Sequence, residues 1–177
     1  MTAETSSGNG STARRGPGVP PDPVASGLVS WRSFDRGDRE ACLALFDSNV
    51  PDFFHEGERP EFEAFLDDLP GPYLVLLRDG AIVACGGYAL HDRATAADLC
   101  WGIVRRDLHG RGFGRELTEG RIARAVADPR VTEIALKTSQ HTVGFYERLG
   151  FVTLSVEIDG YGPGLDRCEM RRAVAAG

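Results

Sequence analysis

The sequence lacks the features that would direct a chain to a membrane, to secretion or to nucleic acid. It contains no apolar run of about 18 residues, the length that a membrane span requires, and its first residues form no hydrophobic segment typical of a secretory signal. The formal net charge is −6 at pH 7, which argues against a general nucleic-acid binder and favours a basic or neutral substrate over an anionic one. We therefore expect a cytoplasmic protein with no membrane and no nucleic-acid partner.

Cysteine is scarce and scattered. The chain has four cysteines, Cys42, Cys85, Cys100 and Cys168, and no two of them form a C-x-x-C pair. Metal sites and disulfide frameworks are usually marked by close and regular spacing of cysteines. Cys85 and Cys100 lie in apolar, strand-like runs, where cysteine behaves as a small hydrophobic residue. We expect free structural thiols in a reducing compartment, and no metal site.

Large apolar side chains are nearly missing from the first 26 residues, which are mostly Gly, Ser, Thr, Pro and Ala. Such a segment cannot bury enough surface to offset the conformational entropy lost on ordering. The rest of the chain is long enough for one substantial core, and 42% of all residues are hydrophobic, as in globular proteins. The sequence therefore predicts a disordered tail over residues 1–26 and one folded domain over residues 27–177.

Strand-like and helix-like patterns alternate along this domain. An Asp79-Gly80 pair between two β-rich runs predicts a tight hairpin. We predict strands over residues 28–34, 73–77, 81–90, 97–104, 131–137, 151–157 and 165–174. We predict helices over residues 35–46, 60–69, 115–128 and 142–149, with loops over 49–59 and 158–164. The resulting order, β-α-α-β-β-β-α-β-α-β-β, indicates a mixed α/β fold.

The most informative stretch, VRRDLHGRGFGREL, joins a predicted buried strand to a predicted helix. Gly110, Gly112 and Gly114 alternate through the connection. Glycine adopts backbone angles that other residues avoid and lets a ligand approach the main chain, while N–H groups at a helix start attract an anion. The pattern therefore predicts a phosphate-binding turn. Alone it also fits a flexible strand–helix connection, and it lacks the Gly-Lys-Ser/Thr of nucleotide hydrolases and the spacing of a dinucleotide fingerprint.

A second motif, FYERLGF, spans residues 145–151. The two motifs in this order resemble the GCN5-related N-acetyltransferase (GNAT) superfamily, and the resemblance covers roughly residues 28–174. It implies the GNAT fold, a mixed central sheet of six to seven strands with helices on both faces. In that fold the fourth strand splays from the fifth and opens a cleft.

The resemblance also implies acetyl-CoA as co-substrate. Main-chain groups at Ile103 and Val104 would pair with the pantetheine arm. Ser139 stands where the family often has an Asn that contacts the cofactor, and His109 stands where the family has Gln or Arg. The residues that would cradle the pyrophosphate are His109, Gly110, Arg111, Gly112, Phe113, Gly114 and Arg115.

One tyrosine carries the chemistry that the resemblance implies. Tyr146 would give a proton to the departing CoA thiolate, because a phenol near the sulfur can act as a general acid. The alternative is that Tyr146 is an amphipathic wall residue with its hydroxyl in water.

The general base is not identified by spacing. The candidates are Asp98, His55, Glu56 and Glu58, and for each of them a solvated surface role is the alternative. The resemblance makes residues 49–59 one wall of the acceptor site. There Phe54, with its neighbour Phe53, either lines the acceptor pocket or pins the loop to the core.

Together these observations predict an acetyl-CoA-dependent N-acetyltransferase that acetylates a primary amine by direct transfer in a ternary complex. A cysteine-linked intermediate is disfavoured, because no cysteine lies in a nucleophile signature. Two alternatives stay open, a transferase that uses another acyl-CoA and a non-catalytic acyl-CoA-binding regulatory module. The sequence leaves open whether the acceptor is a small molecule or a peptide amine, and whether the protein is a monomer or a homodimer.

Overall fold

The computed structural model describes residues 28–90 and 95–174. The predicted tail over residues 1–26 lies outside the described residues. The strands are β1 (Val29–Ser33), β2 (Tyr73–Arg78), β3 (Ala81–Leu90), β4 (Ala96–Val104), β5 (Glu133–Ser139), β6 (Val152–Gly162) and β7 (Leu165–Ala173). The helices are α1 (Arg39–Asp47), α2 (Arg59–Asp67), α3 (Phe113–Ala125) and α4 (Val143–Glu147). Their order is the one that the sequence predicts.

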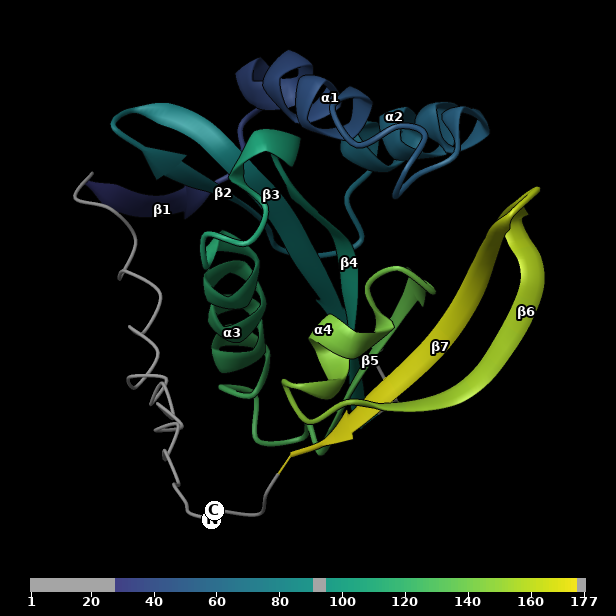
Figure 1. Cartoon of the computed structure of the whole chain (residues 1–177). Coiled ribbons are helices and arrows are strands. Elements are labelled where there is room, and N and C mark those ends of the chain that lie inside the picture. Colours follow the sequence, from purple (N-terminus) through teal and green to yellow (C-terminus); the bar gives the residue numbers. More distant parts are fainter. Residues whose placement is uncertain (1–27, 91–94, 175–177) are drawn as a thin grey trace, which may run out of the picture.

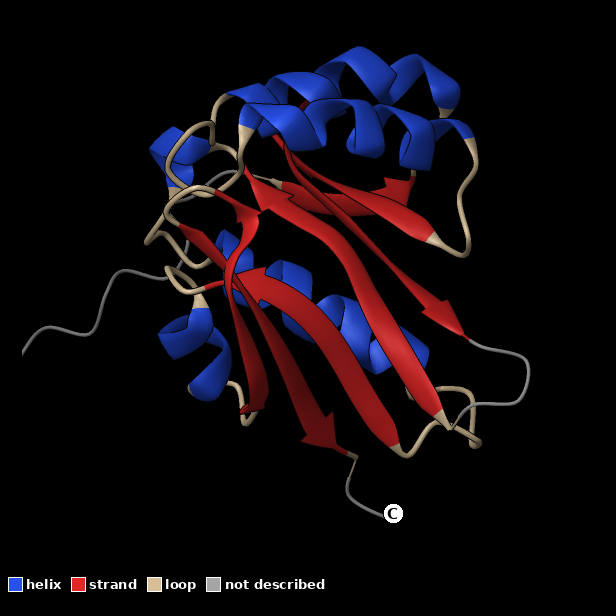
Figure 2. Cartoon of the chain, turned by 90° about the vertical axis from the view of Figure 1, so that its right-hand side faces the viewer, coloured by secondary structure: helices blue, strands red, loops and turns tan. Residues whose placement is uncertain are grey.

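The strands form one seven-stranded sheet in the order β1-β2-β3-β4-β5-β7-β6. Every neighbouring pair is antiparallel except β4 and β5, which run parallel. Helices α1 and α2 cover one face of the sheet, and α3 and α4 lie on the other (Figures 1 and 2). The predicted mixed sheet with helices on both faces is therefore confirmed.

Local sequence signals explain where several elements begin. Asp79 and Gly80 both have positive φ angles, +52° and +80°, as the tight turn of a two-residue hairpin requires. Helix α1 begins at Arg39 rather than at residue 35, because Asp35 instead caps a 3-10 turn, accepting a hydrogen bond from the Gly37 N–H at 2.9 Å. Helix α3 begins at Phe113, two residues earlier than predicted, because Gly112 at φ +92° is its N-cap.

The prediction of a glycine-rich loop over residues 158–164 is wrong. Strand β6 continues to Gly162, which pairs with Leu165 in β7, and only Pro163 and Gly164 lie between the two strands. The glycines of this segment favour a loop when only the local sequence is considered. Pairing with β7, which is a tertiary contact, instead gives the segment the backbone hydrogen bonds of a strand. The strand accommodates its glycines through a register shift between Glu157 and Gly162.

Two apolar layers hold the helices to the sheet. Phe46 and Phe62, from α1 and α2, pack against Ile103 of β4 on one face. On the other face, Ile122 of α3 packs with Met170 of β7 and its neighbours. Both layers are well buried, so the strands between them are fixed in position.

The parallel pairing of β4 and β5 is short. It comprises three residue pairs, of which Asp98 and Ala135 form the last. After this pair, β5 stays paired with β7 over its whole length, whereas β4 stays paired with β3. The two strands therefore separate and leave a cleft in the middle of the sheet.

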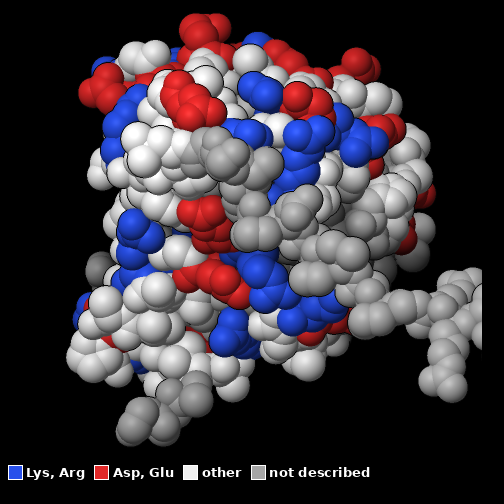
Figure 3. Space-filling model, turned by 60° about the vertical axis from the view of Figure 1, so that its left-hand side comes forward, with Lys and Arg blue, Asp and Glu red and all other residues white. Residues whose placement is uncertain are grey.

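Charges of both signs are intermingled on the surface. The face in Figure 3 shows basic and acidic side chains side by side, in keeping with surface ion pairs such as Arg130–Asp128 and Arg115–Glu119. Among the helices that the structure describes, none has both the length and the apolar character needed to cross a membrane.

Candidate active site

Two adjoining cavities lie at the cleft between β4 and β5. The first, of about 520 Å³, borders the glycine loop, and we call it the loop cavity. The second, of about 620 Å³, lies between α2 and strands β4, β5 and β7, and we call it the sheet cavity. Five residues line both cavities and mark where they meet: Phe53, Phe54, Gly102, Arg121 and Tyr146.

The glycine loop has the backbone geometry that its sequence predicts. Gly110 and Gly112 have φ angles of +76° and +92°, which residues with a side chain rarely adopt. Gly114 has no positive φ, and a Cβ added there would be in ordinary contact with the Phe145 ring at 3.5 Å. The first α3 N–H bonded to a carbonyl is that of Glu116, so the N–H groups of residues 113–115 have no acceptor among the described residues.

The end of β4 is fastened to this loop. The Val104 carbonyl accepts a hydrogen bond from the Asn49 side chain at 2.9 Å and lies 2.9 Å from His109 Nε2. The Arg105 N–H bonds to β3, so by the alternation of an antiparallel ladder the main-chain groups of Val104 face the cleft and those of Ile103 face β3. With its carbonyl occupied, Val104 offers its N–H to the cleft. Asn49 lies in a predicted loop, and no sequence motif marks it as a site residue.

The other residues predicted to bind the cofactor are spread over different surroundings. Arg115 lines the loop cavity and pairs with Glu119. Arg111 is exposed and lines neither of the two cavities, and the Phe113 side chain is buried in the core below the loop. Ser139 lines the sheet cavity rather than the loop cavity.

Aromatic side chains form one wall of the sheet cavity. Phe54 and Phe65 lie with their ring centroids 6.0 and 6.3 Å from that of Trp101. Trp101 has a φ of +37°, a strained value for a bulky residue, at a register shift between β3 and β4. The Tyr73 hydroxyl donates a hydrogen bond to the Trp101 carbonyl at 3.0 Å and so holds this bulge. The wall suits an apolar part of a ligand.

The structure separates the four candidates for the general base. Glu58 and Asp98 both line the sheet cavity, together with Phe54. His55 caps a 3-10 turn, its Nδ1 accepting the Gly57 N–H at 3.1 Å, and lines a different, outer cavity. Glu56 is exposed and lines none of these cavities.

Glu58 is buried at the start of α2, with 7% of its surface exposed. One carboxylate oxygen accepts the His55 N–H at 2.7 Å. Burial raises the pKa of Glu58 above its ordinary value. This carboxyl therefore holds its proton to a higher pH than a surface glutamate does.

Tyr146 lies where the loop cavity and the sheet cavity meet. Its ring packs edge-on against Phe145 and Phe151, with centroids 4.9 and 5.6 Å apart, which fixes its position on α4. Among the described residues no hydrogen bond involves its hydroxyl. The hydroxyl is thus left to a ligand or to water.

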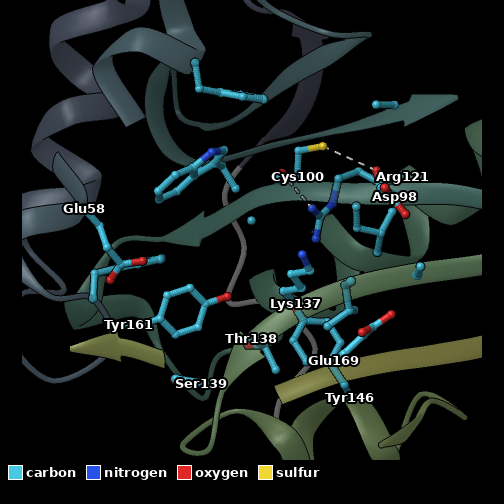
Figure 4. A pocket seen from close by; sticks show the side chains of 18 of the residues that line it. Glu58, Asp98, Cys100, Arg121, Lys137, Thr138, Ser139, Tyr146, Tyr161 and Glu169 are labelled. Atoms are coloured by element: carbon cyan, nitrogen blue, oxygen red, sulfur yellow. Dashed lines mark hydrogen bonds between the residues drawn. The ribbon is translucent and has the colours of Figure 1, made fainter. Parts of the chain in front are cut away.

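Besides Asn49, Tyr161 and Arg121 are functional candidates that no sequence motif marks. Tyr161 lies in the segment predicted as a loop, yet it belongs to β6 and extends into the sheet cavity near Glu58 (Figure 4). Burial, and then the charge of Glu58, raise the pKa of Tyr161 well above its ordinary value.

Arg121 is a buried cation on α3. The glycines in the strands around it, Gly86 and Gly102, were the sequence signal for a close approach of another group.

All four cysteines are free, and Cys100 is the one that lines the sheet cavity. Burial raises the pKa of Cys100 to about 11. Among the described residues, no cluster of three or more His, Cys, Asp or Glu side chains could hold a metal ion.

Comparison with known proteins agrees with this geometry. A solved GNAT-family protein from Desulfovibrio desulfuricans, named as an acetyltransferase, is 22% identical, with a TM-score of 0.70 over 84% of this chain and 100% of that one. The ribosomal-protein-S18-alanine N-acetyltransferase from Escherichia coli is 17% identical, with a TM-score of 0.69 over 85% of this chain and 96% of that one. N-acetylglutamate synthase from Neisseria gonorrhoeae, solved with coenzyme A and N-acetyl-glutamate, is 16% identical, with a TM-score of 0.64 over 84% of this chain and 36% of that one.

At these identities the solved structures establish the fold alone, and no curated protein matches the chain in a sequence comparison. A model of the acetyltransferase (GNAT) family matches residues 42–151, a range that includes both the glycine loop and Tyr146. Because this match covers more than half of the sequence, the chain belongs to the acetyltransferase (GNAT) family.

Proposed function

We propose that the protein is an N-acetyltransferase that transfers the acetyl group of acetyl-CoA directly to a primary amine. Family membership supplies the acetyl-transfer class and acetyl-CoA as the co-substrate. The observation that carries the proposal is the position of Tyr146, where the loop cavity joins the sheet cavity. Donor and acceptor would each occupy one cavity and meet at this residue.

The loop cavity fits the donor. Its glycine loop has positive φ angles at Gly110 and Gly112, and the N–H groups of residues 113–115 are available to a pyrophosphate. Arg115 and Arg148 add positive charge to its lining. When bound, acetyl-CoA supplies an acetyl thioester for the amine to attack. The cleft-facing N–H of Val104 would hydrogen-bond to the pantetheine arm.

Tyr146 would act as the general acid. A phenol beside the leaving sulfur can donate its proton and so prevent the thiolate from reversing the reaction. The ring is fixed by its packing, and its hydroxyl has no competing partner among the described residues. These two facts support the acid role over that of a wall residue.

Of the two carboxylates in the sheet cavity, we assign the role of general base to Glu58. Both Glu58 and Asp98 line the sheet cavity, where the amine must lose a proton. The pKa of Glu58 is raised by burial, which brings it closer to neutral pH, and a base is most effective when its pKa is near the working pH. We propose that Glu58 takes the proton, directly or through water.

Direct transfer is favoured over an acyl-cysteine route. Cys100 is the cysteine that faces the sheet cavity, and with a pKa of about 11 it is a protonated thiol at neutral pH. A thiol in that state is a poor nucleophile.

The experiment is a thiol-release assay on the purified protein, with acetyl-CoA and a panel of primary amines. Since proteins with this fold include a ribosomal-protein alanine N-acetyltransferase and an N-acetylglutamate synthase, the panel should contain peptide N-termini and free amino acids. Amine-dependent release of CoA supports the proposal. Tight binding of acetyl-CoA without release on any amine would favour a regulatory module, and faster release from propionyl- or succinyl-CoA would favour another donor.

A further inference from the structure

Arg121 is a buried arginine in the middle of the site. It extends from α3 toward the sheet, and only 1% of its surface is exposed. Its Nε donates to the Leu117 carbonyl at 3.2 Å, and Nη1 donates to the carbonyls of Gly87 and Cys100 at 3.4 and 3.3 Å. Nη2 donates to the Thr118 hydroxyl at 3.4 Å. All these acceptors are neutral.

Two glycines leave the space that the guanidinium fills. A Cβ on Gly102 would lie 2.6 Å from Arg121 Nη2, and a Cβ on Gly86 would lie 3.1 Å from Nη1. Gly86 and Gly102 lie at the register shift between β3 and β4, so the sheet carries no side chain there. The cation thus reaches through the sheet and lines both the loop cavity and the sheet cavity.

This charge has no carboxylate partner within 4.0 Å among the described residues. A guanidinium carries five N–H groups, and the four bonds above leave one of them, on Nη2, without an acceptor. A buried charge without a counter-ion is costly, so an anion in the adjoining cavity would be stabilised there.

A second cation faces the first. Lys137, the only lysine in the sequence, extends from β5 into the sheet cavity and forms no ion pair among the described residues. In Figure 4 the Lys137 ammonium and the Arg121 guanidinium point toward each other across the cavity. Of the acidic residues that line the sheet cavity, Glu169 is bonded to Arg171.

We propose that Arg121 and Lys137 bind a carboxylate of the acceptor. The inference rests on the proposed function, and it names the substrate class as a primary amine with a carboxylate close to its nitrogen, as in an α-amino acid. Because Arg121 lies where the cavities meet, a carboxylate bound there sets the neighbouring amine beside Tyr146. The remainder of the acceptor then meets the aromatic wall of Phe54, Phe65 and Trp101, which suits an apolar or aromatic side chain.

The test compares each amino acid with the same molecule lacking its carboxylate. L-Phenylalanine is paired with phenethylamine and L-leucine with 3-methylbutylamine, and kcat/KM is measured by thiol release. The wild-type protein should favour the amino acid in each pair. Lys137→Met and Arg121→Met should each lower kcat/KM for the amino acid roughly ten- to hundredfold more than kcat/KM for the decarboxylated amine. Arg124→Met, an α3 arginine that lines neither cavity, is the matched control and should keep the wild-type preference.

Binding of the products gives a readout that does not depend on turnover. In the presence of CoA, calorimetry should show tighter binding of N-acetyl-L-phenylalanine than of N-acetylphenethylamine. If no amine is acetylated but this difference persists, the proposed function fails and the carboxylate site stands. The carboxylate site is overturned if kcat/KM is equal for both members of each pair, or if Lys137→Met keeps the wild-type preference for the amino acid. Either result leaves the proposed acetyl transfer intact. Should Arg121→Met not fold, judged by its melting curve, Lys137→Met decides the question.

Discussion

The side-chain amide of Asn49 lies 2.9 Å from the main-chain carbonyl of Val104 and donates a hydrogen bond to it. The same nitrogen donates to the Leu45 carbonyl at 2.8 Å, and 2% of the Asn49 surface is exposed. One buried amide therefore joins the end of α1 to the end of β4, beside the loop cavity.

Asn49→Ala should lower the free energy of unfolding by about 1–3 kcal/mol, since it leaves buried carbonyls without their donor. It should also weaken acetyl-CoA binding, because the end of β4 is then held less firmly. Urea denaturation and calorimetry measure the two effects. Asp52→Asn, which breaks the exposed Arg106 ion pair nearby, is the control and should change stability by less than about 1 kcal/mol. An unchanged midpoint for Asn49→Ala would contradict the structural role given to this amide.

Gly112→Val should abolish acetyl-CoA binding. The position requires a positive φ, and a branched side chain would also block the approach of a phosphate to the backbone. Gly80→Val is the matched control, since Gly80 has a similar φ of +80° in the distant β2–β3 turn. Both variants should melt at lower temperature than the wild type, but only Gly112→Val should lose affinity in calorimetry. If Gly112→Val and Gly80→Val bind acetyl-CoA with equal affinity, the glycine loop is not the phosphate-binding site.

Tyr146→Phe should lower turnover at least about tenfold while acetyl-CoA affinity stays nearly unchanged, because the ring is kept and only the proton donor is lost. The loss should be smaller with an acyl donor whose thiol is more acidic, since that thiolate departs more readily without a proton. Tyr88→Phe, outside both cavities, is the control. Wild-type turnover in Tyr146→Phe, under conditions where chemistry is limiting, would make Tyr146 a wall residue.

Glu58 should make stability depend on pH. Burial raises its pKa above 4.5, so its contribution to stability is fully present below about pH 4.5 and is lost as the pH rises through the raised pKa. Glu58→Gln removes this titration. The unfolding free energy of the variant minus that of the wild type should therefore increase between pH 4 and pH 8, as measured by urea denaturation. A difference that is flat over this range would mean that Glu58 is not destabilised by burial.

The same variant should lower turnover at every pH, because an amide cannot accept the proton of the amine. Glu58→Gln could lower turnover while the pH dependence of the unfolding free energy stays as in the wild type. That result would assign Glu58 to positioning of the acceptor rather than to proton transfer.

The parts of the fold that the sequence predicts are those set by local chemistry. The Asp79-Gly80 turn, the glycine loop and the order of elements each follow from backbone preferences or from hydrophobic periodicity over a few residues. The end of β6 does not, since whether the segment after Glu157 is strand or loop depends on pairing with β7.

The site divides in the same way. Tyr146 and the glycine loop form compact motifs, so the sequence reveals them. Other site residues contact partners that are distant along the chain, and the adjacent sequence does not predict these contacts. They are Asn49, Tyr161 and Arg121. For Arg121 the sequence signal is a pair of strand glycines, Gly86 and Gly102. A side chain at either position would collide with the guanidinium.

The short parallel ladder between β4 and β5 has a thermodynamic consequence. Only three residue pairs tie these strands together, so two separate arms of the sheet flank the cleft. A donor held by the β4 arm and an acceptor held by Lys137 on the β5 arm would each favour the same spacing of the arms. Linkage then requires the effect to be mutual, so the factor by which bound CoA raises acceptor affinity equals the factor by which acceptor raises CoA affinity.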